Sequence, residues 1–225
     1  MISFKVIDVG LKPYPEVLQL QEELFNKSIE HKLNNRLTEN HLILCEHKPV
    51  FTLGKSGRRE NILVSDEQMN AEFYKVNRGG DVTFHGPGQL VVYPVLDLDV
   101  LHIGLAQYIL QLEETIIQSL KPYGLKGERI ENAAGIWLRG NGNDRKIGAI
   151  GVKASRNVTM HGIAVNINTD LSYFDKIVPC GLKGKETTSL QKELGKETAM
   201  DDYKQLFIKQ FCSVFSVRCQ LSTVN

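Results

Sequence analysis

The sequence lacks long apolar runs, a surplus of charge of either sign, and any internal repeat. No window of its 225 residues approaches the roughly 18 apolar residues that a membrane-spanning helix requires, so we expect no membrane association. A formal net charge of +1 gives no general attraction to nucleic acids, and we expect none as a partner. The N-terminal segment alternates apolar and polar residues, unlike a secretory leader, which predicts a cytoplasmic protein.

Cysteines are few, and none stands in the C-x-x-C pairs that are typical of zinc and redox sites. We therefore predict no metal centre. Cys45 and Cys212 lie inside apolar runs, and we expect both of them, together with Cys219 near the end of the chain, to be core residues.

Cys180 has a different setting, because it lies between Pro179 and Gly181 on a turn that follows an apolar segment. A thiol on such a turn has little side-chain bulk around it, which suits attack on a carbonyl carbon. We therefore predict that Cys180 is a nucleophile. An unperturbed thiol has a pKa of about 8.5 and is only slightly ionised at neutral pH, so it needs a basic or cationic partner.

Two kinds of partner are available for this thiol. His85 and His161 both stand beside glycines, and a Cys/His pair is one interpretation. Lys146 is the other candidate, because it begins a predicted strand whose small residues allow a ligand to lie against the backbone. The residue types alone leave both alternatives open.

The apolar periodicity predicts helices after Pro15, over residues 104–124 and near residues 201–215. Leu105, Ile109, Leu112, Ile116 and Leu120 are expected to share the buried face of the second helix. Strands are predicted at residues 2–8, 41–47, 50–54, 73–77, 89–98, 135–140, 146–154 and 158–167.

The order of these elements predicts an α+β fold with a mixed or antiparallel sheet. We expect Pro94 to push the strand at 89–98 toward an edge or a bulge, because proline cannot donate to the ladder. Residues 1–225 are predicted to form a single catalytic domain, with 192–225 as a candidate small C-terminal extension.

The stretch RGGDVTFHGPGQLVVYP, which begins at Arg78, holds more glycine and proline than a hairpin needs. We name residues 78–88 the glycine-rich segment. Its glycines predict a close approach of another group to the backbone. A phosphate site is disfavoured, because neither the G-x-x-x-x-G-K-[ST] pattern nor a G-x-G-x-x-G pattern opening a helix is present.

Four segments carry a more specific signal when they are taken together. RGGDVTFHGPGQLVVYPVLDL, KIGAIGVKA, HGIAVNINTDLSYFDKIVPCG and TTSL occur in order, with their internal spacings, and closely resemble the lipoyl(octanoyl) transferases of lipoate biosynthesis. The resemblance covers roughly residues 41–190. It implies the fold of lipoate- and biotin-protein ligases, in which helices flank a mixed sheet.

The resemblance also implies the site. A Cys/Lys dyad that carries an acyl-thioester intermediate falls on Cys180 and Lys146, with neither a cofactor nor a metal. The glycine-rich segment then walls a tunnel for an eight-carbon chain, where absent side chains leave room. The residues implied to line the acyl site are Arg78, Gly79, Gly80, Asp81, Val82, Thr83, Phe84, His85, Ala149, Ile150, Gly151, Gly162, Ile163 and Ala164.

The implied donor is octanoyl-acyl carrier protein, and the implied acceptors are lipoyl domains of 2-oxoacid dehydrogenases and the glycine cleavage H protein. Three alternatives stay open at this point. An ATP-dependent lipoate ligase has the same kind of fold but needs no nucleophilic cysteine. A cysteine hydrolase would pair Cys180 with His85 or His161, and a carrier-binding module would catalyse nothing.

Overall fold

The computed structural model describes residues 2–131, 133–140, 143–178 and 186–221. Most strands join one large sheet, whose members are β1 (Ser3–Lys12), β2 (Asn40–His47), β6 (Gln89–Val95), β7 (Gly127–Ile130), β8 (Ala133–Leu138), β9 (Arg145–Ser155), β10 (Val158–Asn166), β11 (Glu186–Thr187) and β12 (Arg218–Leu221). They run in the order β12-β1-β2-β6-β10-β9-β8-β7, with β11 beside β9. β1 pairs in parallel with β2 and β12, while β2, β6, β10, β9, β8 and β7 pair antiparallel in succession, so the sheet is mixed, as predicted.

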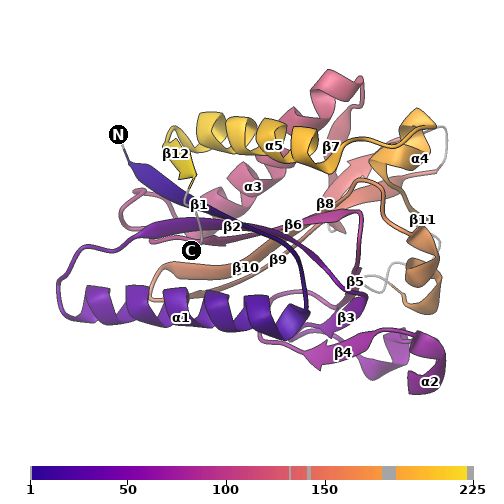
Figure 1. Cartoon of the computed structure of the whole chain (residues 1–225), viewed down its shortest axis with the longest axis horizontal. Helices are drawn as coiled ribbons and strands as arrows, with labels where there is room; N and C mark the ends of the chain where they lie inside the picture. The colour runs from indigo at the N-terminus through magenta and orange to yellow at the C-terminus, as the bar shows by residue number, and fades with distance from the viewer. Residues whose placement is uncertain (1, 132, 141–142, 179–185, 222–225) are drawn as a thin grey trace.

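Three long helices cover this sheet, namely α1 (Tyr14–Leu33), α3 (Leu105–Leu120) and α5 (Met200–Phe215). α1 lies on one face, and α3 and α5 lie on the other (Figure 1). A second, three-stranded sheet sits beside the N-terminal end of α1 (Figure 1). Its strands are β3 (Val50–Leu53), β4 (Glu72–Lys75) and β5 (Val82–His85). Two short α-helices complete the fold: α2 (Asp66–Met69) precedes β4, and α4 (Leu190–Leu194) follows β11.

Sequence signals explain the start of α1 and most of the buried face of α3. Pro15 stands in the first turn of α1, where its missing N–H costs nothing. In α3 the buried stripe begins one turn inside the helix, at Tyr108, and Leu105 is 41% exposed, so Leu105 does not belong to the predicted buried face. Within the described residues, no helix is long and apolar enough to cross a membrane.

The two faces of the large sheet are packed differently. On the α3 and α5 side, Leu90, Val92 and Val165 join a dense cluster of large aliphatic and aromatic side chains. On the α1 side, the neighbouring residues Val91 and Ala164 pack in a smaller cluster. Since successive side chains of a strand point to opposite faces, the same strands build both surfaces.

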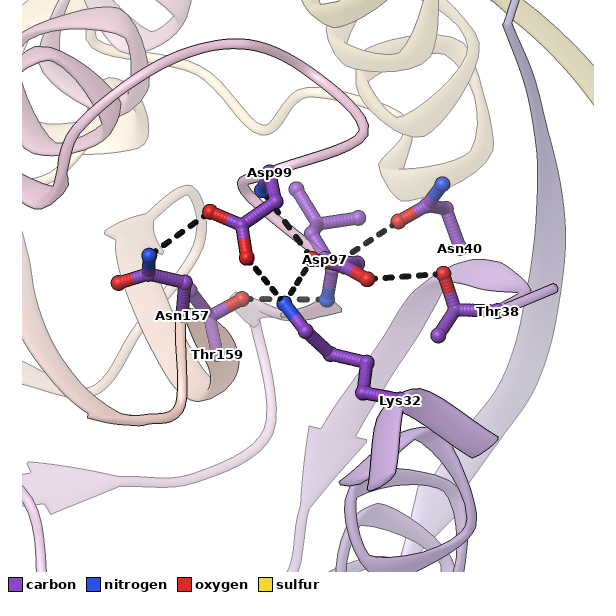
Figure 2. A network of polar contacts seen from close by, with 8 residues as sticks. Lys32, Thr38, Asn40, Asp97, Asp99, Asn157 and Thr159 are labelled. Atoms are coloured by element: carbon purple, nitrogen blue, oxygen red, sulfur yellow. Dashed lines mark hydrogen bonds and ion pairs between the residues drawn. The ribbon is translucent and has the colours of Figure 1, made fainter. Parts of the chain in front are cut away.

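A polar network fixes the C-terminal end of α1 to the sheet (Figure 2). The Lys32 ammonium donates to Asp97 at 2.5 Å and to Asp99 at 2.6 Å, and Thr38 donates to the other oxygen of Asp97. The Asp97 N–H donates to the side chain of Asn40 at 2.8 Å. Because Asp97 is buried, each of its bonds is shielded from competition with water. The helix that carries Tyr14 at its other end is thereby held in place.

Pro94 lies inside the large sheet, so the expectation of an edge strand is wrong. β6 pairs with β2 on one side, where Pro94 stands opposite Leu42, and with β10 on the other. Extending the β10 register places His161 opposite Pro94, where a rung cannot form because proline has no N–H. His161 takes φ +56° there, and its N–H donates to Gln21 on α1 instead. Pro94 is tolerated inside the sheet because the hydrogen-bond ladder between β6 and β10 is interrupted at His161.

Cys45 is a buried free cysteine, as predicted. Cys212 is only partly buried and forms a disulfide with Cys219, so the expectation that these two are core thiols is wrong. α5 ends at Phe215, and Ser216 takes a left-handed conformation with φ +54°. The chain then turns back as β12, which brings the two cysteines together across seven positions.

Candidate active site

A cavity lies on the α1 side of the large sheet, between β6, β9 and β10, the glycine-rich segment and the first turn of α1. Its empty space, counted to the open mouth, is about 780 Å³. Of the residues implied to line an acyl site, all except Gly79 and Phe84 lie in its wall, and so does Lys146. Phe84 is buried elsewhere, with its ring stacked on Tyr173 at 4.2 Å between centroids.

Small residues on adjacent strands form the floor of this cavity. In the register of β9 and β10, Ala149 pairs with Ala164 and Gly151 pairs with Gly162. Ala164 also pairs with Val91 on β6. Cross-strand partners share a face, so this row presents mainly methyl and methylene surface toward α1. Such a floor suits a flexible alkyl chain.

Lys146 reaches the cavity because β9 contains a bulge. The register between β8 and β9 shifts by one residue, which leaves Ile147 as the extra residue. Ile147 is fully buried under α3, and a Cβ on Gly148 would point the same way, 3.2 Å from Ile116. An uninterrupted strand would turn Lys146 to that face too, whereas the bulge turns it to the opposite face. Its ammonium lies 5.5 Å from the ring centre of Trp137.

The glycine-rich segment packs its backbone directly against β9. The Gly79 N–H donates to the carbonyl of Val152 at 2.9 Å. A Cβ on Gly151 would stand 3.0 Å from the Gly79 carbonyl oxygen and 3.1 Å from Arg78 Cδ. Gly80 has φ +87°, a conformation that glycine adopts without strain. These glycines therefore allow two backbones to touch, and the open space beside them is provided by the alanines of the floor.

A directed set of hydrogen bonds runs through the wall of the cavity. The Arg78 guanidinium donates to the Thr52 hydroxyl at 2.9 Å. The amide of Gln89 donates to Phe84 O and to Asn166 Oδ1, which leaves its own oxygen to accept from Nδ1 of His85 at 2.8 Å. The Nδ1–H tautomer of His85 follows from this orientation.

The same set of hydrogen bonds continues to the far side of the site. The side-chain amide of Asn166 donates to the carbonyl of Thr188, whose N–H donates in turn to the carbonyl of Lys146. The network thus joins the glycine-rich segment, β10 and the TTSL stretch, which lie far apart in the sequence. Because its members are buried, their mutual bonds fix the shape of the cavity wall.

The two candidate histidines are poor bases in this structure. Burial, assisted by the neighbouring His47 imidazole and the Arg78 guanidinium, lowers the pKa of His85 to about 3. Burial, followed by the charges of Arg78 and Lys153, lowers the pKa of His161 to about 3. Both imidazoles are therefore neutral at physiological pH and hold protons weakly.

Several wall residues escape sequence reasoning. They are Tyr14, Gln89, Tyr93, Asn166, Phe174 and Thr187. Gln89 and Asn166 stand inside quoted motif segments, and their polar character beside apolar runs was a usable signal. Tyr14 offers none, because only tertiary packing brings the start of α1 to the cavity. Cys180 lies outside the described residues, and among the described residues no group of three His, Cys, Asp or Glu side chains is placed to hold a metal.

The fold and the cavity define a class of catalytic domain. The profile described as the lipoyl protein ligase A/B catalytic domain matches residues 13–212. A bipartite lipoate protein ligase from Thermoplasma acidophilum, solved as part of an archaeal lipoylation system, shares the fold with a TM-score of 0.72. Its sequence is 14% identical, and the match covers 100% of this chain and 88% of that chain. The predicted fold class is confirmed.

Closer relatives define the branch of this class. An octanoyltransferase from Christiangramia forsetii is 47% identical over 222 residues, which cover 94% of this chain and 95% of that protein. An octanoyltransferase from Parabacteroides distasonis is 49% identical over 220 residues, covering 94% of this chain and 100% of that protein. The chain belongs to the octanoyltransferases of the lipoyl protein ligase A/B family, and it is an acyltransferase.

Proposed function

We propose that the chain transfers an octanoyl group from the thioester of an acyl carrier protein to a lysine of a lipoyl domain, through an acyl thioester on Cys180. Its kinship with octanoyltransferases supports the octanoyl group and the role in protein lipoylation. The observation that carries the chemical proposal is a buried lysine, Lys146, in the wall of a cavity with a methyl-lined floor.

In the first step the Cys180 thiolate attacks the thioester carbonyl of the donor. A new C–S bond forms to Cys180, and the bond to the pantetheine sulfur breaks. The Lys146 ammonium gives its proton to that sulfur, so the carrier leaves as the thiol and Lys146 enters the second step as the neutral amine. One thioester replaces another, so the step is nearly isoenergetic and needs no nucleoside triphosphate.

In the second step the acceptor lysine, in its neutral form, attacks the acyl-Cys180 carbonyl. A C–N bond forms, the C–S bond breaks, and the amine loses one proton as the amide appears. The exchange of a thioester for an amide is downhill, so it drives the overall transfer.

Lys146 is proposed to serve both steps. A nearby ammonium lowers the pKa of a thiol by favouring the thiolate, which supplies the nucleophile for the first step. In its neutral form the same amine is able to take the proton that the acceptor lysine loses. Its burial on the cavity face of β9 supports this role, because the attraction between charges is stronger where water is excluded.

The cavity is proposed to hold the octanoyl chain along the floor of Ala149 and Ala164. Burial of roughly seven alkyl carbons at about 0.8 kcal/mol each stabilises the bound chain by up to about 5–6 kcal/mol. That energy grows with each buried methylene, so the cavity is proposed to select acyl donors by chain length.

The rival functions have weaker support. A Cys/His hydrolase needs an imidazole that accepts a proton near neutral pH, whereas burial lowers the pKa of both His85 and His161 to about 3. The ATP-dependent ligase shares the fold, but the relatives that match at 47–49% identity are octanoyltransferases.

Intact mass spectrometry tests the proposal. The protein is mixed with octanoyl-acyl carrier protein without ATP, and a lipoyl domain is added afterwards. We expect one octanoyl adduct that disappears as the octanoylated lipoyl domain accumulates, and no adduct on Cys180→Ser. Transfer by Cys180→Ser at the normal rate, or product only with ATP, would overturn the proposal.

A further inference from the structure

We propose that Gly135 on β8 is the positioning residue for Lys146, because only a residue without a side chain leaves the space in which the Lys146 ammonium lies. The inference concerns a position that the sequence did not single out. Its catalytic consequence rests on the proposed function of Lys146, whereas its structural part does not.

The local geometry leaves no room for a side chain. A Cβ on Gly135 would lie 2.5 Å from Lys146 Cε and 3.2 Å from its Nζ. It would also lie 2.4 Å from the carbonyl oxygen of Gly148. The contacts at 2.4 and 2.5 Å are shorter than a Cβ atom tolerates, so the Lys146 side chain or the backbone of β9 would have to move.

The backbone of Gly135 is itself unusual, with φ +112° in the middle of a strand. That conformation lies in a region that other residues rarely adopt. Gly135 therefore excludes a side chain for three reasons, namely its dihedral angle, its contact with the Gly148 carbonyl oxygen and its contact with Lys146. Gly124 isolates the first, because it also has a positive φ, +74°, but a Cβ added to it would meet nothing within 4 Å. Truncation of Lys146 isolates the third.

Three features together hold the Lys146 side chain in place, and we call them the lysine seat: the bulge at Ile147, the Trp137 indole and the bare backbone of Gly135. The bulge at Ile147 turns Lys146 away from the α3 side, and the indole of Trp137 lies 5.5 Å from its Nζ. On the neighbouring strand β8, the absence of a Cβ at Gly135 leaves room for Cε and Nζ of Lys146. Displacement of a catalytic group by about 1 Å is enough to slow a reaction about 10²-fold.

Trp137 is the single tryptophan of the chain, so its fluorescence reports directly on this seat. The difference in Trp137 emission between wild type and Lys146→Met defines the contribution of the lysine. We expect the emission of Gly135→Ala to resemble that of Lys146→Met. The emission of the matched control Gly124→Ala should equal that of wild type. Wild-type emission from a folded Gly135→Ala would overturn the inference.

Kinetics then separate placement from catalysis. We expect Gly135→Ala to lower kcat for octanoyl transfer about 10²-fold with KM little changed, and to move the pH profile of Cys180 alkylation to higher pH. Gly124→Ala should match wild type in both. Altered emission with unchanged kcat would leave the placement standing and would refute the proposed role of Lys146.

A double-variant cycle covers the case in which Gly135→Ala folds poorly. If the contact with Lys146 is responsible, Gly135→Ala should lower the melting temperature less in a Lys146→Ala background than in wild type, since Lys146→Ala removes Cε and Nζ. An equal loss in both backgrounds, or failure of the double variant to fold, would show that the backbone of β9 sets the requirement and would overturn the inference.

Discussion

The two faces of the large sheet are made by alternate residues of the same strands, yet one is solid and the other encloses a cavity. On β6, Val92 is buried among the large side chains under α3 and α5, whereas Val91, the preceding residue, lines the cavity under α1. On β10, Val165 and Ala164 divide in the same way. The difference teaches that one sheet combines a face of small residues, which leaves room for a cavity, with a face that is packed firmly enough to support it.

The largest effect on the rate of transfer is expected from Lys146, the residue that the β9 bulge turns to the cavity face. Lys146→Met should slow acylation of Cys180 by at least about 10²-fold, because the cation that favours the thiolate is lost. The measurement is rapid-quench mass spectrometry of the acyl-enzyme. Alkylation of Cys180 against pH should shift to higher pH, and an unchanged profile would refute the pairing.

The comparison of faces is sharpened by making one substitution on each side of β6. Val92→Ala should lower the free energy of unfolding by about 2–3 kcal/mol, since two methyl groups and their packing are lost from a dense core. Val91→Ala should cost about 1 kcal/mol less, because its side chain already borders open space. Urea denaturation of both variants gives these values, and equal costs would contradict the distinction between the faces.

The cavity face also predicts a dependence of stability on pH. His161 has a folded-state pKa of about 3, below its ordinary value of 6.5, so the unfolded state binds more protons between these values. Its contribution is fully present above pH 6.5 and is lost as the pH falls toward 3.

His161→Asn isolates this contribution. Asparagine tolerates the left-handed backbone that His161 adopts and has no imidazole to titrate. We expect the variant to lose less stability than wild type between pH 6.5 and 4, measured by thermal melts. Parallel pH curves for the two proteins would show that His161 titrates normally in the folded state.

Much of the fold follows from the sequence, because periodicity and turn residues act locally. The long helices and the strands around the glycine-rich segment begin close to their predicted positions. Pro94 and the pair Cys212–Cys219 were mispredicted because tertiary context decided them, through an interrupted rung in one case and a turn after α5 in the other.

The candidate site divides similarly. Lys146 was predicted by resemblance and lies in the cavity wall, but the bulge that turns it there depends on a one-residue mismatch between β8 and β9 that no single-strand pattern reveals. Tyr14 joins the wall only through the docking of α1. The role of Cys180 stays a prediction, because it lies outside the described residues.

The central claim, that the cavity face holds the acyl chain, is tested most directly by the ratio of kcat/KM for octanoyl and hexanoyl carriers. Ala164→Val adds two methyl groups to the floor and should lower this ratio about tenfold, since burial of each displaced methylene is worth about 0.8 kcal/mol. Val165→Ile adds volume to the opposite face, where overpacking costs stability of about 1–3 kcal/mol and should leave the ratio unchanged. If Ala164→Val folds normally and slows both donors equally, the acyl chain does not lie on this floor and the account is contradicted.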